Sequence, residues 1–333
     1  MLCAVLTVLG GLLSAQTARA GETYESAQTL TEGADTSVTL TSGNTSWYKF
    51  TMDKTGYAEL VITSVKAPDL RIMVYDQGMN LIYDENTDSH DVFKTEKYGI
   101  KPGTIYYIKL YSYKSDPVTF TIKAVTTAAT DWEQEPNNSF NDATELAAGV
   151  ETHANLTRVK DNDFYSFVLP DNGTVSFRCE FEYNIFGLGL QVFDKDKNRL
   201  YSDSTFKDGG ITSDAVSGKK GDIFYALTTY GPKNYTITAV FTPVTAPARV
   251  TGLNLKRLKD GKIRVIYSKV PEAAGYQVQY TYGTKTKNVT VKGTTTTKLS
   301  VPKGTKTTVR VRAYKSNGKA RIYGKWSVKK SLK

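Results

Sequence analysis

Two short acidic stretches of the chain carry side chains of the types and spacing that bind a cation. Glu133, Glu135 and Asn137 occupy every second position of the stretch DWEQEPNN. In an extended segment alternate side chains point to one face, so these three side chains would lie together. Calcium takes about six to eight oxygen ligands from carboxylates, amide carbonyls and the backbone. The three side chains do not complete that shell, and Asp161 and Asp163, just before a predicted strand, are the nearest source of further ligands.

The same stretch can also be interpreted as a solvated linker between domains. Its polar residues would then cap a short helix at NDATEL, with Ser139 or Asn141 accepting a first-turn N–H group. The two interpretations do not exclude each other.

Helical periodicity is nearly absent from the sequence. Short alternating runs such as YAELVITS, IYYIKLYSY and VRVRAY are separated by clusters of Gly, Asn, Asp and Pro, which is typical of an all-β protein. Helical turns are expected only near ESAQTL and FNDATEL. The length of 333 residues predicts two or three domains.

The chain contains an internal repeat. SGNTSWYKFTM is matched by VKDNDFYSFVL, and IMVYDQGMNLIYDE by LQVFDKDKNRLYSD, at offsets between 116 and 118 residues. An offset this constant indicates two copies of one domain, at 21–128 and 131–243. Each copy is long enough for a two-sheet sandwich with its own core. Residues 247–333 are different in sequence, but their short strands also suit a sandwich.

Both copies resemble bacterial pre-peptidase C-terminal domains, the jelly-roll-like β-sandwiches related to the collagen-binding domains of clostridial collagenases. The second copy carries the motif EQEPNNSFNDATEL, then NLTRVKDNDFYSF, then GDIFYAL and NYTITAV. The resemblance implies a calcium ion between the N-terminal arm and the Asp loop. Its implied ligands are Glu133, Glu135, Asn137, Asp161 and Asp163, with Asn138 as a further candidate.

The first copy lacks both parts of this site. The positions equivalent to the arm residues fall on Thr17, Arg19 and Gly21, and those equivalent to the two aspartates on Asn44 and Ser46. We therefore expect calcium binding in the second copy only.

Residues 247–333 resemble a fibronectin type III domain of the kind found in secreted bacterial proteins, which is an immunoglobulin-like sandwich. The matching pieces are VTGL, VPEAAGYQVQY, VRVRAY and YGKWS, with Tyr267 where a tryptophan is usual. This segment holds 22 Lys and Arg against two acids, a net charge of +20, whereas the whole chain carries +10. Such asymmetry indicates an anionic cell wall or acidic polysaccharide as partner, or a surface that only keeps the domain soluble. Nucleic acid is not expected as a partner of an exported protein.

Residues 1–20 predict a signal peptide. The apolar run LCAVLTVLGGLL is followed by Ala18 and Ala20 around Arg19, an A-x-A cleavage pattern that would leave Gly21 at the start of the mature chain. The alternative is a membrane anchor, but the run is shorter than the roughly 20 residues that span a bilayer. We expect a secreted, extracellular protein without a membrane span, with a cell-wall association through its basic segment.

The sequence shows no catalytic constellation. His90 and His153 lie in different copies, outside any zinc-protease motif, and there is no nucleophile elbow or phosphate-binding loop. Cys179 alternates with apolar residues and is expected to be a buried strand residue. Asp161 and Asp163 can also be interpreted as the acid and base of a glycosidase, but their pairing with the arm favours calcium. We therefore expect no enzymatic activity.

Tyrosines supply a candidate ligand-binding surface. Alternation places Tyr107, Tyr111 and Tyr113 on one strand face of the first copy, and the second copy retains Tyr225 and Tyr230. The resemblance implies that exposed tyrosines hold extended protein or sugar chains, a role that suits this side chain. The alternative is that many of them are core residues.

Together these features predict a bacterial, non-catalytic protein that binds extracellular matrix protein, polysaccharide or cell wall. The alternative is a targeting or accessory part of a secreted peptidase or glycosidase system.

Overall fold

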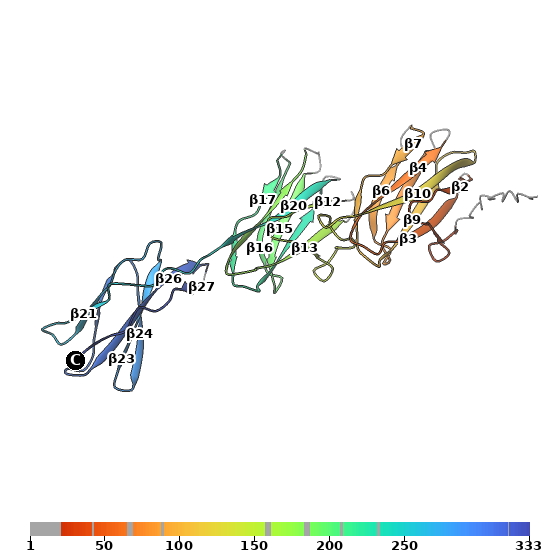
Figure 1. The fold of residues 1–333 in the computed structure, drawn as a ribbon. Helices are drawn as coiled ribbons and strands as arrows, with labels where there is room; N and C mark the ends of the chain where they lie inside the picture. Colours follow the sequence, from red (N-terminus) through yellow and green to blue (C-terminus); the bar gives the residue numbers. More distant parts are fainter. Residues whose placement is uncertain are drawn as a thin grey trace, which may run out of the picture.

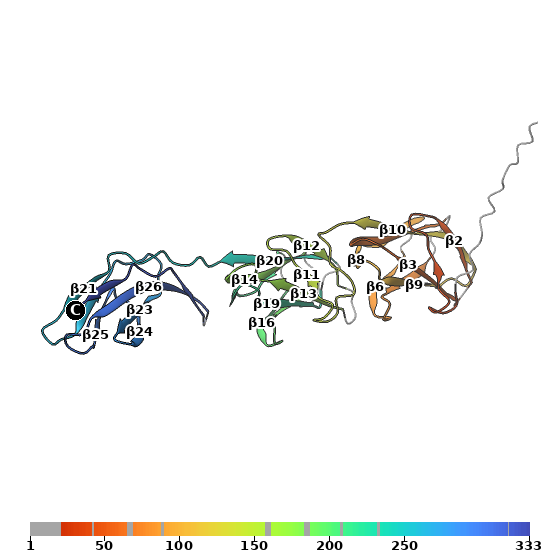
Figure 2. The same cartoon turned by 60° about the horizontal axis from the view of Figure 1, so that its bottom comes forward.

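Strands are the only regular secondary structure that the described part of the chain forms. The computed structural model describes residues 21–333 except 42, 65–68, 88–89, 157–160, 183–186, 207–208, 232–233 and 319. The predicted signal peptide, with Cys3, lies outside the described residues. Within them the chain forms strands and no helix, which confirms the all-β prediction, and no helix able to cross a membrane is found there. Figure 1 and Figure 2 show three bodies of strands that follow one another in an elongated row.

Strands β1 to β10 form two sheets. One sheet has the order β1-β3-β9-β5-β6, and the other has the order β2-β10-β4-β7, with β8 also paired to β4. The strand bounds are β1 (Gln28–Thr29), β2 (Thr36–Leu40), β3 (Thr45–Thr51), β4 (Gly56–Ser64), β5 (Leu70–Tyr75), β6 (Leu81–Asn86), β7 (Val92–Lys94), β8 (Tyr98–Ile100), β9 (Ile105–Ser112) and β10 (Val118–Ala128).

Strands β11 to β20 repeat this arrangement. Their sheets have the orders β11-β13-β19-β15-β16 and β12-β20-β14-β17, with β18 paired to β14. Every strand is thus the counterpart of the one ten positions earlier. The bounds are β11 (Thr144–Glu145), β12 (Glu151–Ala154), β13 (Asn162–Val168), β14 (Gly173–Glu180), β15 (Leu188–Asp194), β16 (Arg199–Thr205), β17 (Ile211–Thr212), β18 (Val216–Gly218), β19 (Ile223–Thr229) and β20 (Tyr235–Pro243).

Strands β21 to β28 form a third pair of sheets. The smaller has the order β21-β22-β25, and the larger has the order β24-β23-β26-β27, with β28 on β26. The bounds are β21 (Asn254–Arg257), β22 (Ile263–Ile266), β23 (Gly275–Tyr282), β24 (Lys285–Val291), β25 (Thr296–Leu299), β26 (Thr307–Asn317), β27 (Ala320–Tyr323) and β28 (Lys330–Leu332).

Alternation along the strands builds a core between each pair of sheets. β14 buries Val175, Phe177 and Cys179, and Cys179 is fully buried, as expected. β13 follows the same rule, but its inward row begins with a carboxylate, because Asp163 points to the same side as Tyr165. An acidic side chain at a core position needs a partner, and that partner defines the site described below.

The two expected helical turns are short parallel strands instead. β1 pairs with β3 through Gln28 and Tyr48, and β11 pairs with β13 through Thr144 and Tyr165. These segments are too short to nucleate a stable helix, and a sheet edge supplies their backbone partners directly. The expected helix cap is also wrong, because the Ser139 hydroxyl hydrogen-bonds to the carboxylate of Asp142 (2.6 Å) in a turn.

The first and second repeats touch through β8. Gly99 in β8 packs so closely on the chain before β11 that a Cβ atom there would lie 2.3 Å from the carbonyl oxygen of Glu133. Beside it, the rings of Tyr57 and Trp132 lie 4.8 Å apart. The acidic arm of the second repeat is therefore held against the first repeat.

Gly99→Ala is expected to lower the free energy of unfolding by about 1–3 kcal/mol, because its methyl group meets backbone that cannot move aside easily. Gly78→Ala is the matched control, since the atoms nearest to its Cβ belong to side chains and not to backbone: the amide of Asn80 at 3.1 Å and a carboxylate oxygen of Asp76 at 3.3 Å. Denaturant unfolding of both variants measures the difference, and equal destabilisation would contradict the close contact at Gly99.

Candidate metal centre

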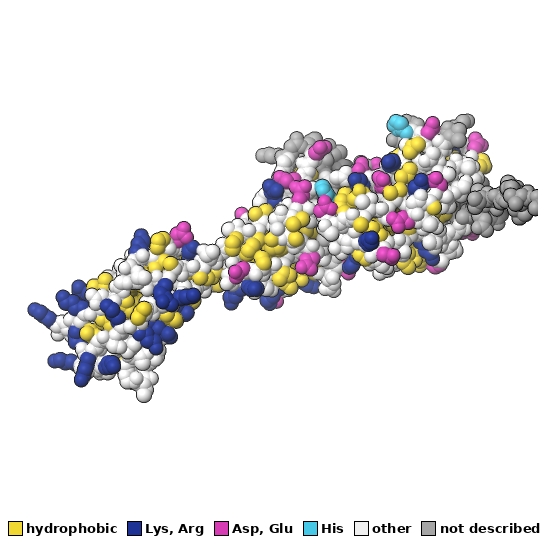
Figure 3. Space-filling view, in the orientation of Figure 1, with side chains coloured by type: hydrophobic (Ala, Val, Ile, Leu, Met, Phe, Trp, Pro, Cys, Tyr) yellow, Lys and Arg dark blue, Asp and Glu magenta, His cyan; other side chains and the backbone are white. Residues whose placement is uncertain are grey.

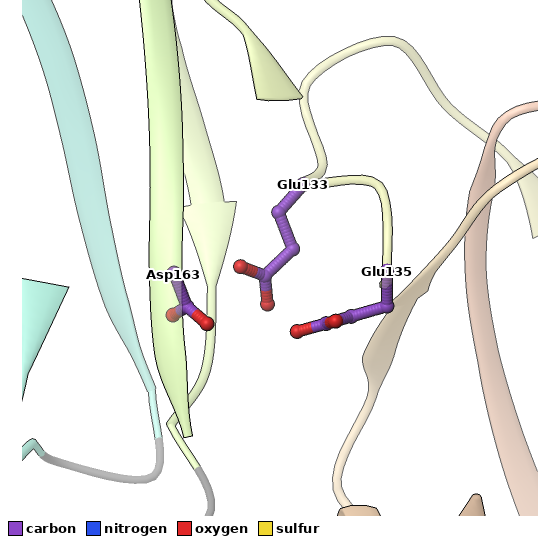
Figure 4. Close-up of side chains that lie close together, drawn as sticks. All are labelled: Glu133, Glu135 and Asp163. Carbon is purple, nitrogen blue, oxygen red and sulfur yellow. The ribbon is translucent and has the colours of Figure 1, made fainter. Parts of the chain in front are cut away.

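Three carboxylates from two separate segments meet inside the second repeat. Glu133 and Glu135 come from the arm before β11, and Asp163 comes from β13 (Figure 4). One oxygen of each lies within 4.8 Å of the others, and all three side chains are at most 1% exposed. Asn137 is equally buried, so every second residue of the arm points inward, as the spacing predicted. Burial of this row contradicts the interpretation of the arm as a solvated linker.

Glu133 is fixed at the centre of a hydrogen-bond network. Its Oε1 accepts a hydrogen bond from the backbone N–H of Asn155 (2.8 Å). Its Oε2 accepts from the Asn137 side-chain amide (3.1 Å) and from the hydroxyl of Tyr165 (2.9 Å). These donors hold the carboxylate in one orientation, facing the other two acids.

Asp163 is held in the same way from the opposite sheet. The hydroxyl of Tyr235, on β20, donates to its Oδ2 (2.6 Å). That hydroxyl also lies 2.6 Å from the hydroxyl of Tyr165 and 2.7 Å from that of Thr228. The two tyrosines thus connect the arm to both sheets of the sandwich.

Three buried oxygens of this cluster accept no hydrogen bond from any described residue. They are Oε1 of Glu135, Oδ1 of Asn137 and Oδ1 of Asp163. An unsatisfied buried acceptor costs about 1–3 kcal/mol, more when it is charged, so native structures rarely keep several together. A bound cation would satisfy all three at once.

The electrostatics of the cluster also indicate a bound cation. Burial, and then the charge of the nearby Asp161, raises the pKa of Glu133 to about 8. The same two causes raise the pKa of Glu135 well above its ordinary value, and burial with the charge of Glu133 does so for Asp163. No ion pair among the described residues neutralises the three acids. The missing positive charge fits a metal ion, and ligands that are all carboxylate or amide oxygens suit a hard cation.

The remaining predicted ligands lie around this cluster. Asp161 is buried and contributes its charge to the three acids, although it is not part of the closest group. The Asn138 side-chain oxygen accepts a long hydrogen bond from the backbone N–H of Asn162 (3.5 Å), so it ties the arm to the Asp loop.

Sequence analysis did not identify Tyr165, Tyr235 or Asn155 as parts of the site. Tyr165 was detectable, because it continues the alternation that begins with Asp161 and Asp163 on one strand. Tyr235 comes from β20 and Asn155 directly follows β12, and only the packing of two sheets brings them to the arm.

The corresponding place in the first repeat has different chemistry. Ser46 is buried at the position of Asp163, and Asn44 is exposed at that of Asp161. The strand register places Phe120 where the second repeat has Tyr235, so the second hydroxyl of the network is missing there. The positions equivalent to Glu133 and Glu135 lie outside the described residues.

The first repeat completes the walls of the site in the second. The Tyr106 hydroxyl donates to the backbone carbonyl of Glu135, and the Asn155 side chain donates to the carbonyl of Lys97. Asn155 therefore contacts Glu133 with its backbone and the first repeat with its side chain. The group of acids and the contact between the repeats therefore share Asn155 and the arm.

The predicted tyrosines lie on the outer faces of two corresponding sheets. Tyr107 and Tyr111 alternate with buried residues along β9, and Tyr113 is 49% exposed. In the second repeat Tyr225 lies 5.1 Å from Phe140, whose ring also packs on those of Phe164 and Phe193. Tyr230 does not belong to this strand face: it lies in the loop after β19 and is 79% exposed.

Neither a family model nor a curated protein matches this chain. Three solved structures with detectable similarity belong to the two families that the motifs resemble. The pre-peptidase C-terminal domain of a collagenase from Bacillus anthracis is 15% identical, over 29% of this chain and 93% of its own, with a TM-score of 0.26. A two-domain fibronectin type III segment of chicken tenascin is 18% identical, over 52% of this chain and 99% of its own, with a TM-score of 0.26. A fibronectin type III domain of human collagen XX is 20% identical, over 27% of this chain and 98% of its own, with a TM-score of 0.22. Similarities this low carry no information on ligands or activity.

Neutralising two of the acids is expected to have opposite effects with and without calcium. In chelator, Glu135→Gln/Asp163→Asn should be more stable than the wild type, because two desolvated charges that repel each other are removed. With millimolar calcium the order should reverse, since only the wild type gains stability from a ligand bound to the native state. Thermal melting in both buffers measures the crossover.

The control is Asp142→Asn, which removes a solvent-exposed acid from the same segment. It should melt like the wild type in both buffers. Equal melting shifts on calcium addition in the wild type and the double variant would contradict the assignment of the site.

The stability of the metal-free protein is expected to fall as the pH rises from about 5 to about 8. The unfolded chain releases the proton of Glu133 near the ordinary pKa of 4.5, whereas the folded chain holds it until about 8. Folding therefore binds protons in this range, and each such group costs up to about 1.4 kcal/mol per pH unit. Unfolding in chelator across this range measures the slope, which calcium should abolish by holding the carboxylates deprotonated.

Proposed function

We propose that this chain is a secreted, non-catalytic binding protein with a structural calcium ion in its second repeat. Its signal peptide would be residues 1–20, and its domains 21–128, 131–243 and 247–333. The single observation that carries the calcium assignment is the buried group of Glu133, Glu135 and Asp163, with three unsatisfied oxygens around it.

Calcium is preferred over other metals on the chemistry of the ligands. Soft or borderline metals select cysteine and histidine, which are absent from this group of acids. Magnesium keeps several of its waters, whereas calcium accepts a buried cage of protein oxygens with irregular geometry. The proposed ligands are Glu133, Glu135, Asn137, Asp161 and Asp163.

The proposed binding role rests on surfaces rather than on a cleft. In the first repeat Tyr24, Trp47, Tyr75 and Tyr107 form a connected group of rings, with ring centroids 5.6 to 6.2 Å apart. Lys109 lies over the ring of Trp47 at 5.5 Å. Aromatic rings with adjacent polar groups grip extended protein or glycan chains with little loss of side-chain entropy.

The two repeats differ in how open this face is. Phe140 of the second repeat packs on the rings of Phe164, Phe193 and Tyr225 and is partly buried. Tyr24, its counterpart in the first repeat, is 40% exposed. We therefore propose the first repeat as the main polymer-binding domain.

Binding of the full chain to an array of matrix proteins and glycans tests this role. Tyr107→Ala/Tyr111→Ala should weaken the strongest interaction at least tenfold, because it removes the aromatic surface along β9. Phe206→Ala is the control, since this exposed residue lies outside that face. Hydrolysis of any arrayed protein or glycan by the purified chain would contradict the non-catalytic assignment.

A further inference from the structure

The C-terminal unit carries an ordered row of arginines on one outer face. Arg310 and Arg312 point outward from β26, opposite Gln279 and Gln277 of β23. The Nε atom of each arginine donates to the side-chain oxygen of its facing glutamine at 2.8 Å. This contact fixes the plane of each guanidinium group and leaves the four N–H groups of its two Nη atoms for other acceptors.

Aromatic rings support the same two guanidinium groups. The ring centroid of Trp326 lies 4.3 Å from the guanidinium carbon of Arg310 and 4.4 Å from that of Arg312. The ring centroid of Tyr323 lies 3.9 Å from the guanidinium carbon of Arg312. A guanidinium group stacked on rings loses less entropy when it binds an anion than a free lysine does. We call the surface of Gln277, Gln279, Arg310, Arg312, Tyr323 and Trp326 the arginine face.

The unit offers the arginine face no acid of its own. Residues 247–333 contain two carboxylates, and each pairs with a lysine elsewhere: Asp260 with Lys262 (3.6 Å) and Glu272 with Lys315 (2.7 Å). Figure 3 shows that Lys and Arg cover this end of the molecule, whereas Asp and Glu gather on the two repeats. The arginine face therefore presents positive charge toward solvent and suits an anionic partner from outside the unit.

The spacing of the arginines selects among anionic polymers. Arg310 and Arg312 are separated by two residues of extended strand, about 6.7 Å. The number of covalent bonds between these two Cα atoms equals the number between successive phosphorus atoms in a polymer of three-carbon polyol phosphates. In an extended chain of that kind the phosphates therefore repeat at a spacing similar to that of the two arginine Cα atoms, so two successive phosphates suit the pair of arginines. Arginine binds phosphate through two parallel hydrogen bonds, which the free Nη groups allow.

We propose that the arginine face binds an anionic polymer of polyol units joined by phosphodiesters. This inference rests on the proposed role of the chain as an extracellular binding protein and names the partner of its C-terminal unit. The rings and glutamines align the arginines, and the arginines contact the phosphates.

Titration of the full chain with a synthetic poly(glycerol phosphate) tests the proposal. Arg310→Gln/Arg312→Gln should lower the affinity at least tenfold. The control is Lys256→Gln/Lys298→Gln, which removes the same charge from the other sheet of the same unit, where Lys256 and Lys298 flank Arg264 in register. The control should lose less than threefold. Equal losses in both variants, or no loss in the first, would overturn the arginine face as the binding site.

A measurement on the unaltered chain guards against misfolding of the variants. An arginine-specific reagent followed by peptide mass spectrometry should show Arg310 and Arg312 protected by the polymer and the exposed Arg264 unprotected. Protection of all three alike would contradict a specific face.

Two further outcomes separate this inference from the proposed function. Tighter binding of polygalacturonate or heparin than of the phosphate polymer would overturn the phosphodiester assignment and leave a polymer-binding protein. If the intact chain bound no polymer, protein or glycan at all, both the phosphodiester assignment and the proposed binding function would be overturned.

Discussion

The repulsion among Glu133, Glu135 and Asp163 is the constraint on which the middle of this molecule depends. Each charge buried away from water costs several kcal/mol, and three within 4.8 Å of one another raise that cost further. The surrounding residues supply donors but no cation: tyrosine hydroxyls, an asparagine amide and backbone N–H groups. Such an arrangement is stable in two ways, with protons on the acids or with a metal ion among them. The calcium proposal corresponds to the second state.

The same constraint shapes the contact between the two repeats. The arm that carries Glu133 and Glu135 lies between β8 of the first repeat and β13 of the second, so its ordering affects both sandwiches. Tyr106 donates a hydrogen bond to it from the first side, and Tyr165 from the second. Lys97 is linked to it only through Asn155, whose side chain donates to the Lys97 carbonyl and whose backbone N–H donates to Glu133. A cation that holds the arm would therefore stiffen the junction and fix the aromatic face of one repeat relative to the other. Under the proposed function, the first repeat would offer the binding surface and the second would anchor the junction.

Local pattern in the sequence was enough to predict the all-β fold, because strand alternation and turn residues are local signals. It was also enough to bring Glu133, Glu135 and Asn137 to one face, since that needs only an extended backbone. Local pattern could not identify Tyr235 and Asn155 as parts of the site, because their positions next to the arm depend on how the two sheets pack against each other. The helical turn at NDATEL was predicted wrongly for a related reason: the edge of β13 supplies backbone partners for Thr144 and Leu146 that no local pattern reveals.

Counting bound ions is the most direct measurement of the central claim. The purified chain would be dialysed against micromolar calcium and its metal content determined by elemental analysis, beside Glu135→Gln/Asp163→Asn. The calcium site described above predicts one retained ion per wild-type chain and none in the double variant. Two ions per wild-type chain would place calcium in the first repeat as well. No retained ion, or one that persists in the double variant, would contradict a calcium site built by the arm and β13.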